Sequence, residues 1–254
     1  MRLMDGAEAI RGDLPSARTV LVDVPLEAGE AQDSRVSRFT SIQLVRDRQA
    51  QALASIDGLV VTIGGDCGVE LAAIGRATDL DENVAVIWFD AHPDLNTPES
   101  SASAAFTGMV LRTLVGDGPA GLVPARPVPP SNVLLVGARE FDQPEEDYLP
   151  GSGIRSLEVS EATADAVVEA IAAMGAKRIY VHIDLDVLDP AEIAGLDSPV
   201  PFGLESVVLV ETIRALRGRF ELVGAGITEF APASADHAVD DLPTILRIIG
   251  ALTS

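Results

Sequence analysis

Short apolar runs rich in β-branched residues recur along the chain and alternate with segments of helical periodicity. Because a strand inside a parallel sheet is buried on both faces, these runs predict strands at residues 20–22, 59–63, 84–89, 133–136, 179–183 and 222–227. The periodic segments predict helices at residues 36–56, 69–77, 109–115, 163–174, 205–216 and 242–252. Strands that alternate with helices pair in parallel through right-handed crossovers, which predicts an α/β fold.

Polar clusters follow several of these apolar runs directly, at the predicted carboxyl ends of the strands. That edge of an α/β sheet is where ligands bind. The first cluster, residues 64–68, is rich in glycine and taken alone is typical of a plain strand-to-helix turn.

Two further clusters carry acidic groups at alternate positions. Asp90, His92 and Asp94 follow one predicted strand, and Asp184 and Asp186 follow another. In extended backbone, alternate side chains project to the same side, so the members of each cluster converge. Helix caps and turn formers would explain single residues of this kind but not their spacing.

Four carboxylates at one sheet edge would repel one another, and some would stay protonated, unless a divalent cation lay between them. Oxygen-rich ligation with one imidazole favours Mn²⁺ or a similar ion over a thiolate-type zinc site. Two shared aspartates permit two ions, and such a pair activates water for hydrolysis. The clusters therefore predict hydrolytic metal chemistry.

Length and composition indicate the kind of protein that carries this site. With 254 residues, of which 47% are hydrophobic and 22% charged, the chain is expected to form one domain over residues 1–254. Its apolar runs are shorter than the roughly 20 residues that cross a bilayer, so we expect no membrane span. The N-terminus lacks the apolar core of a signal peptide, which predicts a cytoplasmic protein.

The charge balance limits the partners. Against 18 Lys and Arg stand 39 Asp and Glu, a net charge of −21 that would repel nucleic acid and acidic membranes. A cationic substrate is compatible with it. The single cysteine, Cys67, excludes a disulfide within the chain and fits a reducing compartment.

Three motifs, in this order, resemble the ureohydrolase family of arginases, agmatinases and formiminoglutamases. They are Gly64-Gly65-Asp66, Asp90-Ala91-His92-x-Asp94 and Asp184-x-Asp186-x-x-Asp189-Pro190. The resemblance spans most of the chain. It implies an arginase-like three-layer α/β/α fold with a mainly parallel sheet of about eight strands, and a binuclear manganese centre.

The resemblance also implies a role for each matching residue. Asp90 and Asp184 would bridge the two ions. His92 and Asp186 would complete the shell of one ion. Asp94 would ligate the other ion and hydrogen-bond the hydroxide, which makes it a catalytic candidate.

A histidine ligand usually follows Gly-Gly-Asp in the family, whereas this chain has Cys67. A thiolate prefers softer ions, so the cofactor is expected to be two Mn²⁺ ions if Cys67 ligates and one otherwise, with Zn²⁺, Fe²⁺, Co²⁺ or Ni²⁺ as alternatives. The other interpretation is that Cys67 is a small buried hydrophobic residue.

The resemblance further implies which residues bind substrate. Glu229 matches a glutamate that pairs with the substrate guanidinium and is a second catalytic candidate. Asn96 and Ser103 match polar positions that hold the rest of the substrate, whereas Ala105 stands where arginases tend to have asparagine. Thr107 replaces a proton-shuttling histidine, and its hydroxyl does not titrate near neutral pH.

The chain has two other histidines that could replace these groups. His182 lies two residues before Asp184 on the same strand face, which favours a place in the packing layer rather than in the site. His237 follows Glu229 in the chain and is expected in a solvated loop.

These features predict a metal-dependent hydrolase of C–N bonds in linear guanidino or amidino compounds. Arginine, agmatine, guanidinobutyrate and formiminoglutamate all remain open as substrates. Family resemblance implies a homo-oligomer, a trimer or hexamer. The alternatives are an inactive family member that binds or regulates, because of Cys67 and Thr107, and a zinc deacetylase that uses one ion.

Overall fold

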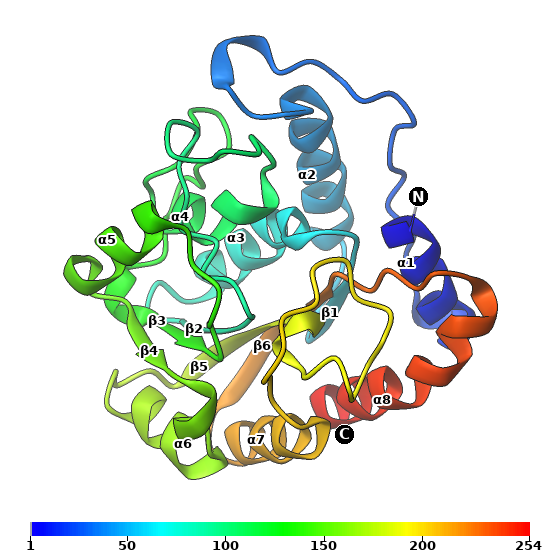
Figure 1. The fold of residues 1–254 in the computed structure, drawn as a ribbon, viewed down its shortest axis with the longest axis vertical. Helices are drawn as coiled ribbons and strands as arrows, with labels where there is room; N and C mark the ends of the chain where they lie inside the picture. The colour runs from blue at the N-terminus through cyan, green and yellow to red at the C-terminus, as the bar shows by residue number, and fades with distance from the viewer. Residues whose placement is uncertain (1) are drawn as a thin grey trace.

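The centre of the molecule is a six-stranded parallel sheet (Figure 1). The computed structural model describes residues 2–254. The strands lie in the order β1-β6-β5-β2-β3-β4. Their bounds are β1 (Val60–Ile63), β2 (Ala85–Phe89), β3 (Val133–Val136), β4 (Arg155–Leu157), β5 (Arg178–Asp184) and β6 (Glu221–Thr228).

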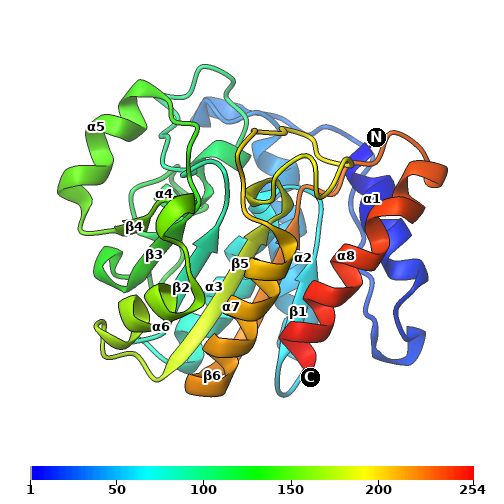
Figure 2. The same cartoon turned by 60° about the horizontal axis from the view of Figure 1, so that its bottom comes forward.

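Helices cover both faces of this sheet, as Figure 2 shows with α7 and α8 across one face. One core cluster joins the sheet to α1 (Arg2–Gly12), α6 (Ala164–Ala172), α7 (Ser206–Arg219) and α8 (Ala235–Thr253). The opposite cluster joins it to α2 (Phe39–Leu53), α3 (Glu70–Leu80), α4 (Val110–Leu114) and α5 (Gln143–Ser152). The three-layer α/β/α architecture is therefore confirmed.

Short 3-10 helices occupy several of the connections. They are η1 (Ser16–Arg18), η2 (Gln32–Ser34), η3 (Cys67–Val69), η4 (Thr107–Met109), η5 (Pro130–Asn132), η6 (Val159–Glu161) and η7 (Leu185–Val187). Three of them, η3, η4 and η7, begin at or beside residues that the sequence singled out.

The central strands show why the apolar runs were continuous. On β2, Ile87 and Phe89 belong to one core cluster, whereas Val86 and Trp88 belong to the other. A strand with helices on both faces needs apolar side chains at every position. Core residues run from Ile10 to Leu252, and the single domain over residues 1–254 stays a prediction.

The predicted strand at residues 20–22 is wrong. This segment has no strand partner in the described chain, and Val20 and Leu21 are 60% and 72% exposed. The sequence also missed β4, a three-residue edge strand with exposed positions, and the helices α1 and α5. Six strands are described where about eight were expected.

Across residues 2–254, the helices are too short or too polar to cross a lipid bilayer.

Candidate metal centre

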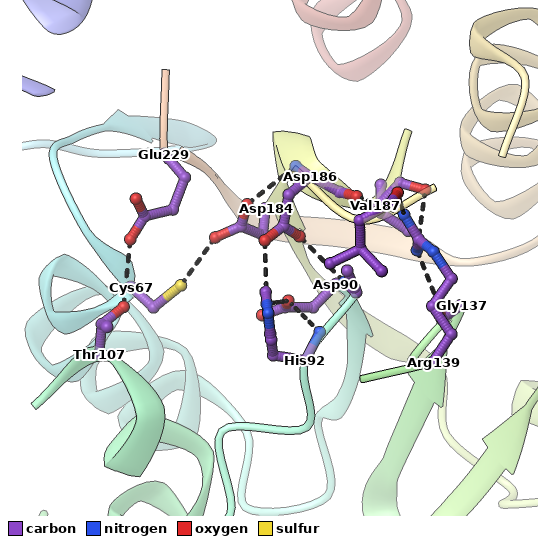
Figure 3. A network of polar contacts seen from close by, with 12 residues as sticks. Cys67, Asp90, His92, Thr107, Gly137, Arg139, Asp184, Asp186, Val187 and Glu229 are labelled. Atoms are coloured by element: carbon purple, nitrogen blue, oxygen red, sulfur yellow. Dashed lines mark hydrogen bonds and ion pairs between the residues drawn. The ribbon is translucent and has the colours of Figure 1, made fainter. Parts of the chain in front are cut away.

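The polar clusters meet at the carboxyl ends of four adjacent strands. Cys67 begins η3 after β1, Asp90 follows β2, Asp184 ends β5 and Glu229 follows β6. Because β1, β6, β5 and β2 are neighbours in the sheet, their ends bring these side chains together (Figure 3). The convergence expected from the parallel sheet is thus observed.

One group of possible ligands contains Asp90, His92 and Asp186. His92 Nδ1 lies 2.9 Å from Asp186 Oδ2 and 3.5 Å from Asp90 Oδ1. The backbone N–H of Ala91 donates to Asp186 Oδ1 at 3.0 Å, and that of His92 donates to Asp90 Oδ1 at 2.7 Å. Backbone and imidazole together fix both carboxylates.

The charges in this group compensate one another. Burial opposes a charge on His92, but the hydrogen bonds that His92 donates to Asp186 and Asp90 outweigh it and raise the pKa of His92 to about 11. Burial likewise disfavours ionised Asp90, yet the two histidines His182 and His92 lower its pKa to about 2. Without metal, the positive charge of protonated His92 therefore balances the charges of Asp90 and Asp186.

A second group lies around Asp184, which is buried. Cys67 Sγ donates to Asp184 Oδ2 at 3.1 Å, and Thr228 Oγ1 donates to the same oxygen at 3.2 Å. Asp184 Oδ1 accepts the N–H of Asp186 at 2.9 Å at the start of η7. Burial, followed by the nearby carboxylates, raises the pKa of Asp184 and of the Cys67 thiol well above their usual values.

Asp94 has a buried oxygen without a partner. Within residues 2–254 no group donates a hydrogen bond to its Oδ2. Burial and then the charge of Asp90 raise the pKa of Asp94 well above its usual value. Its φ of 52° lies in the left-handed region, so the backbone is strained to present this side chain. An unsatisfied carboxylate among carboxylates fits a site that binds a cation.

Glu229 lies beside Thr107, as Figure 3 shows. The Thr107 hydroxyl donates to Glu229 Oε1 at 3.2 Å. Burial, with the charges of Asp66 and Asp197, raises the pKa of Glu229 to about 8 although the Thr107 hydroxyl opposes this. Glu229 also has a positive φ, 64°, and its N–H donates to the carbonyl of Gly65 at 2.8 Å.

The side chains of Asn96 and Ser103 have other partners than this pair. Asn96 is buried, its Nδ2 donates to Asp142 Oδ2 at 2.9 Å, and its Oδ1 accepts from Ser100 Oγ at 2.7 Å. Ser103 is exposed and its Oγ lies 3.3 Å from that of Ser101. Their role in substrate binding stays a prediction.

Sequence reasoning missed Arg139, which ties together the loops beneath the site. Its guanidinium donates to five carbonyl oxygens on three segments, those of Gly137, Asp186, Val187, Val200 and Pro201. Figure 3 shows it on the far side of Val187 from the carboxylates. A half-buried arginine among carbonyls has no local sequence signal.

The sequence favoured a place for His182 in the packing layer rather than in the site, and the structure places it in that layer and next to the site. The residue is fully buried as expected, but its Nε2 lies 3.7 Å from Cys67 Sγ and 3.8 Å from Asp90 Oδ2. Its Nδ1 lies 2.9 Å from Glu70 Oε1. His237 is exposed as expected, though it lies in the first turn of α8 rather than in a loop.

Several known proteins are similar to this chain in sequence. Residues 10–243 match the arginase family. The chain is 32% identical to an arginase of Entamoeba histolytica over 191 residues, 71% of this chain and 64% of that protein, or less than two thirds of its length. It is 30% identical to an N(omega)-hydroxy-L-arginine amidinohydrolase of Streptomyces lavendulae over 206 residues, 81% of this chain and 72% of that protein.

Solved structures have the same fold. The crystal structure of Entamoeba histolytica arginase in complex with L-ornithine superposes with a TM-score of 0.81 at 26% identity, covering 91% of this chain and 82% of that one. The arginase of Bacillus subtilis superposes with a TM-score of 0.85 at 24% identity, covering 97% and 90%.

Proposed function

Because the chain belongs to the arginase family, we propose that it is a metal-dependent hydrolase of a linear guanidino or amidino compound. Several of its relatives carry names that refer to guanidino substrates. The observation that carries the proposal is that Asp90 joins two groups of possible metal ligands, one with Asp184 and one with Asp186. The buried Asp94 and Glu229 lie close enough for their charges to act on this cluster.

The residues present fit a pair of divalent ions. Asp90, Asp184, His92 and Asp186 would hold one ion, and Asp94 would hold the other together with Asp90 and Asp184. The unpartnered oxygen of Asp94 supports this assignment. When bound, the ions would supply Lewis acidity and make water nucleophilic near neutral pH. We propose Mn²⁺ for the half that carries His92, because its ligands are oxygens and one imidazole.

Glu229 is the group that would bind the substrate cation. A carboxylate matches a planar guanidinium with two parallel hydrogen bonds. The Thr107 hydroxyl donates to one of its oxygens and thereby orients the other toward the substrate. An approaching guanidinium would also stabilise the ionised form and lower the raised pKa of Glu229.

Asp94 is the group that would carry the proton. Water adds to the guanidino carbon, the C–N bond to the leaving amine breaks, and one proton must pass from the water to that amine. The Asp94 carboxylate has two oxygens, of which one would serve the ion and the other would hold this proton between the two steps. Thr107 cannot, because its hydroxyl does not titrate near neutral pH.

A second candidate function is an inactive relative that binds its ligand without turnover. It is favoured by Cys67 in place of a histidine and by Thr107 in place of the proton shuttle. This candidate predicts that a guanidino compound binds at Glu229 and is released unchanged.

The cytoplasmic location and a trimeric or hexameric assembly belong to the same proposal. Light scattering coupled to size-exclusion chromatography measures the assembly directly.

A panel of L-arginine, agmatine, guanidinobutyrate and formiminoglutamate tests the function. The purified protein is incubated with each compound and with Mn²⁺, Fe²⁺, Co²⁺, Ni²⁺ or Zn²⁺, and urea, ammonia and formamide are quantified. We expect one compound to be turned over by the wild type and not by Asp184→Asn. A folded protein that turns over none of them with any ion would favour the inactive relative.

A further inference from the structure

His182 is buried in β5 and has no part in the function proposed so far. It shares its strand face with Asp184, two residues on, so both side chains reach the same side of the sheet. Its Nε2 lies 3.7 Å from Cys67 Sγ and 3.8 Å from Asp90 Oδ2. The imidazole therefore faces the half of the centre that lacks the family's usual histidine.

The surroundings of His182 fix which ring nitrogen carries the proton. Nδ1 lies 2.9 Å from Glu70 Oε1, and Glu70 also accepts the Tyr180 hydroxyl at 2.5 Å. The ring stacks on Trp88 with centroids 3.6 Å apart. Glu70 favours a proton on Nδ1, so an Nε2 that releases its proton to a metal would present its lone pair toward Cys67. A histidine that binds metal is held in this way, by a carboxylate on its other nitrogen.

The sheet makes room for this carboxylate. Gly226 on β6 pairs in register with His182, and a Cβ at Gly226 would lie only 1.5 Å from Glu70 Oε1. Any other residue there would displace Glu70. A buried carboxylate is costly unless it is paired, and Glu70 is paired with the Tyr180 hydroxyl and with His182 Nδ1.

The spacing of the atoms around His182 fits a metal ion. One atom from each of Cys67, Asp90, His182 and Asp184 falls within 4.8 Å of all the others. The contacts that join Cys67 to its neighbours measure 3.1 Å to Asp184 Oδ2 and 3.7 Å to His182 Nε2. Ligands at roughly 2.0–2.3 Å from a tetrahedral zinc ion are separated by about 3.3–3.8 Å. Asp94, whose charge acts on Cys67, has an unpartnered Oδ2, which is an independent sign of a cation beside this group.

We propose that His182 and Cys67 together ligate the second ion of the centre, and that this half selects Zn²⁺ over Mn²⁺. Thiolate with imidazole is a softer ligand set than the oxygens around His92, and Mn²⁺ binds such sets most weakly among the first-row ions. Cys67 stands in η3 where the family usually has a histidine, and His182 on β5 would supply an imidazole in its place. The inference rests on the proposed metal-dependent function. It implies one Zn²⁺ beside Cys67 and one Mn²⁺ beside His92.

Cobalt and zinc binding to chelator-treated protein test this without any turnover. With one equivalent of Co²⁺, the wild type should show thiolate-to-cobalt charge-transfer absorption, and Cys67→Ser should lose it. His182→Gln should keep the absorption but bind Zn²⁺ at least about tenfold more weakly. With one equivalent each of Zn²⁺ and Mn²⁺, mass spectrometry should find zinc retained in preference.

Tyr180→Phe is the matched control, because it removes the other hydrogen bond to Glu70 on the same strand and leaves the imidazole in place. Its loss of zinc affinity should be smaller than that of His182→Gln. Absence of thiolate absorption in cobalt-loaded wild type would overturn the proposal, as would a folded His182→Gln that binds zinc as tightly as Tyr180→Phe.

X-ray absorption at the zinc edge covers the case in which His182→Gln does not fold. The wild type with one equivalent of Zn²⁺ should show one sulfur and an imidazole around the ion, and a shell that lacks either overturns the proposal. Since no readout here is catalytic, a protein that binds zinc as stated but turns over nothing would contradict only the proposed function.

Discussion

The burial of Glu229 opposes the ionised state that it needs to bind a cation. It is buried next to other acidic residues, which raises its pKa to about 8, yet it must be ionised to pair with a guanidinium. Below that pKa the carboxyl is mostly neutral, and above it the carboxylate is available. The affinity for a cationic ligand should therefore rise with pH.

This predicts the pH dependence of binding to metal-free protein. The dissociation constant of agmatine should fall as the pH increases, by up to about tenfold per unit below pH 8, and then level off. Calorimetry over about pH 6 to pH 9 measures it. Glu229→Gln should bind weakly at every pH. A dissociation constant of the wild type that does not change over this range would contradict the role of Glu229.

Asp94 and Asp186 differ in what their carboxylates contact. Asp186 accepts the N–H of Ala91 and lies 2.9 Å from His92 Nδ1, whereas Asp94 Oδ2 has no donor among residues 2–254. Replacement of Asp94 removes repulsion, but replacement of Asp186 breaks contacts.

Without metal, Asp94→Asn should therefore melt at or above the wild-type temperature. Asp186→Asn should lower the free energy of unfolding by about 1–3 kcal/mol. Turnover by Asp94→Asn should fall by about 10²–10⁴-fold. Thermal denaturation and product assays measure both. An Asp94→Asn protein less stable than Asp186→Asn would show that Asp94 has a structural partner instead.

The residues that alternate along an extended segment were predictable from the sequence, because their spacing alone makes them converge. The contact between Glu70 and His182 was not predictable, since it depends on how α3 packs against β5 and β6. On β6, Gly224 pairs with Tyr180 and Gly226 pairs with His182. Two glycines in one strand indicate a close approach by another group, and this was the available signal.

Among the elements, the loop after β3 supports the site through Arg139. Gly137 in that loop has a φ of 89° and lies where a Cβ would come within 2.8 Å of Val187 Cγ2. Beside it, the Arg139 guanidinium donates to the carbonyl of Asp186 at 2.8 Å and to that of Val200 at 2.7 Å. Its planar set of donors holds the loop after β5 in place.

Arg139→Lys should therefore weaken the half of the centre that carries His92. An ammonium keeps the charge but cannot reach several carbonyls at once, so manganese affinity should fall by about 10–100-fold. The melting temperature should fall as well. Metal titration of the folded variant measures the affinity, with Arg126→Lys on the surface as the control. Equal affinity in Arg139→Lys and wild type would contradict this positioning role.

Elements buried on both faces were predicted well, and exposed ones were not. The run at residues 20–22 has strand-like composition, but exposed residues without a pairing strand do not form one. β4 contributes only three residues and is exposed at two of them, so it gave no apolar run. α8 begins at Ala235, where Ser234 accepts the N–H of His237, seven residues before the predicted start.

On the scale of the whole molecule, the fold gathers acidic groups where only a cation or a proton can balance them. Burial raises the pKa of Asp94, Asp184, Asp186 and Glu229, and carboxylate partners raise the pKa of His92 against burial. A group with a raised folded-state pKa holds more protons in the native state than in the unfolded state. Stability from such a group is lost as the pH rises toward that pKa.

Metal-free protein should therefore lose stability between about pH 6 and pH 8. One such group costs up to about 1.4 kcal/mol per pH unit, which lowers the melting temperature by about 5–10 °C over this range. Divalent ions should restore it, more strongly at pH 8. Calorimetric melting with chelator and with added metal measures both. A metal-free protein that becomes more stable over this range would show that the carboxylates are not gathered as described.

Turnover as a function of added Mn²⁺ tests the central claim most directly. Chelator-treated protein that retains one equivalent of Zn²⁺ is titrated with Mn²⁺, and urea released from the best guanidino substrate is measured. The account predicts no turnover at the start and saturation near one equivalent of Mn²⁺ per chain. Turnover that is unaffected by chelation and by Mn²⁺, or its absence at every metal content, would contradict the assignment as a metal-dependent guanidino hydrolase.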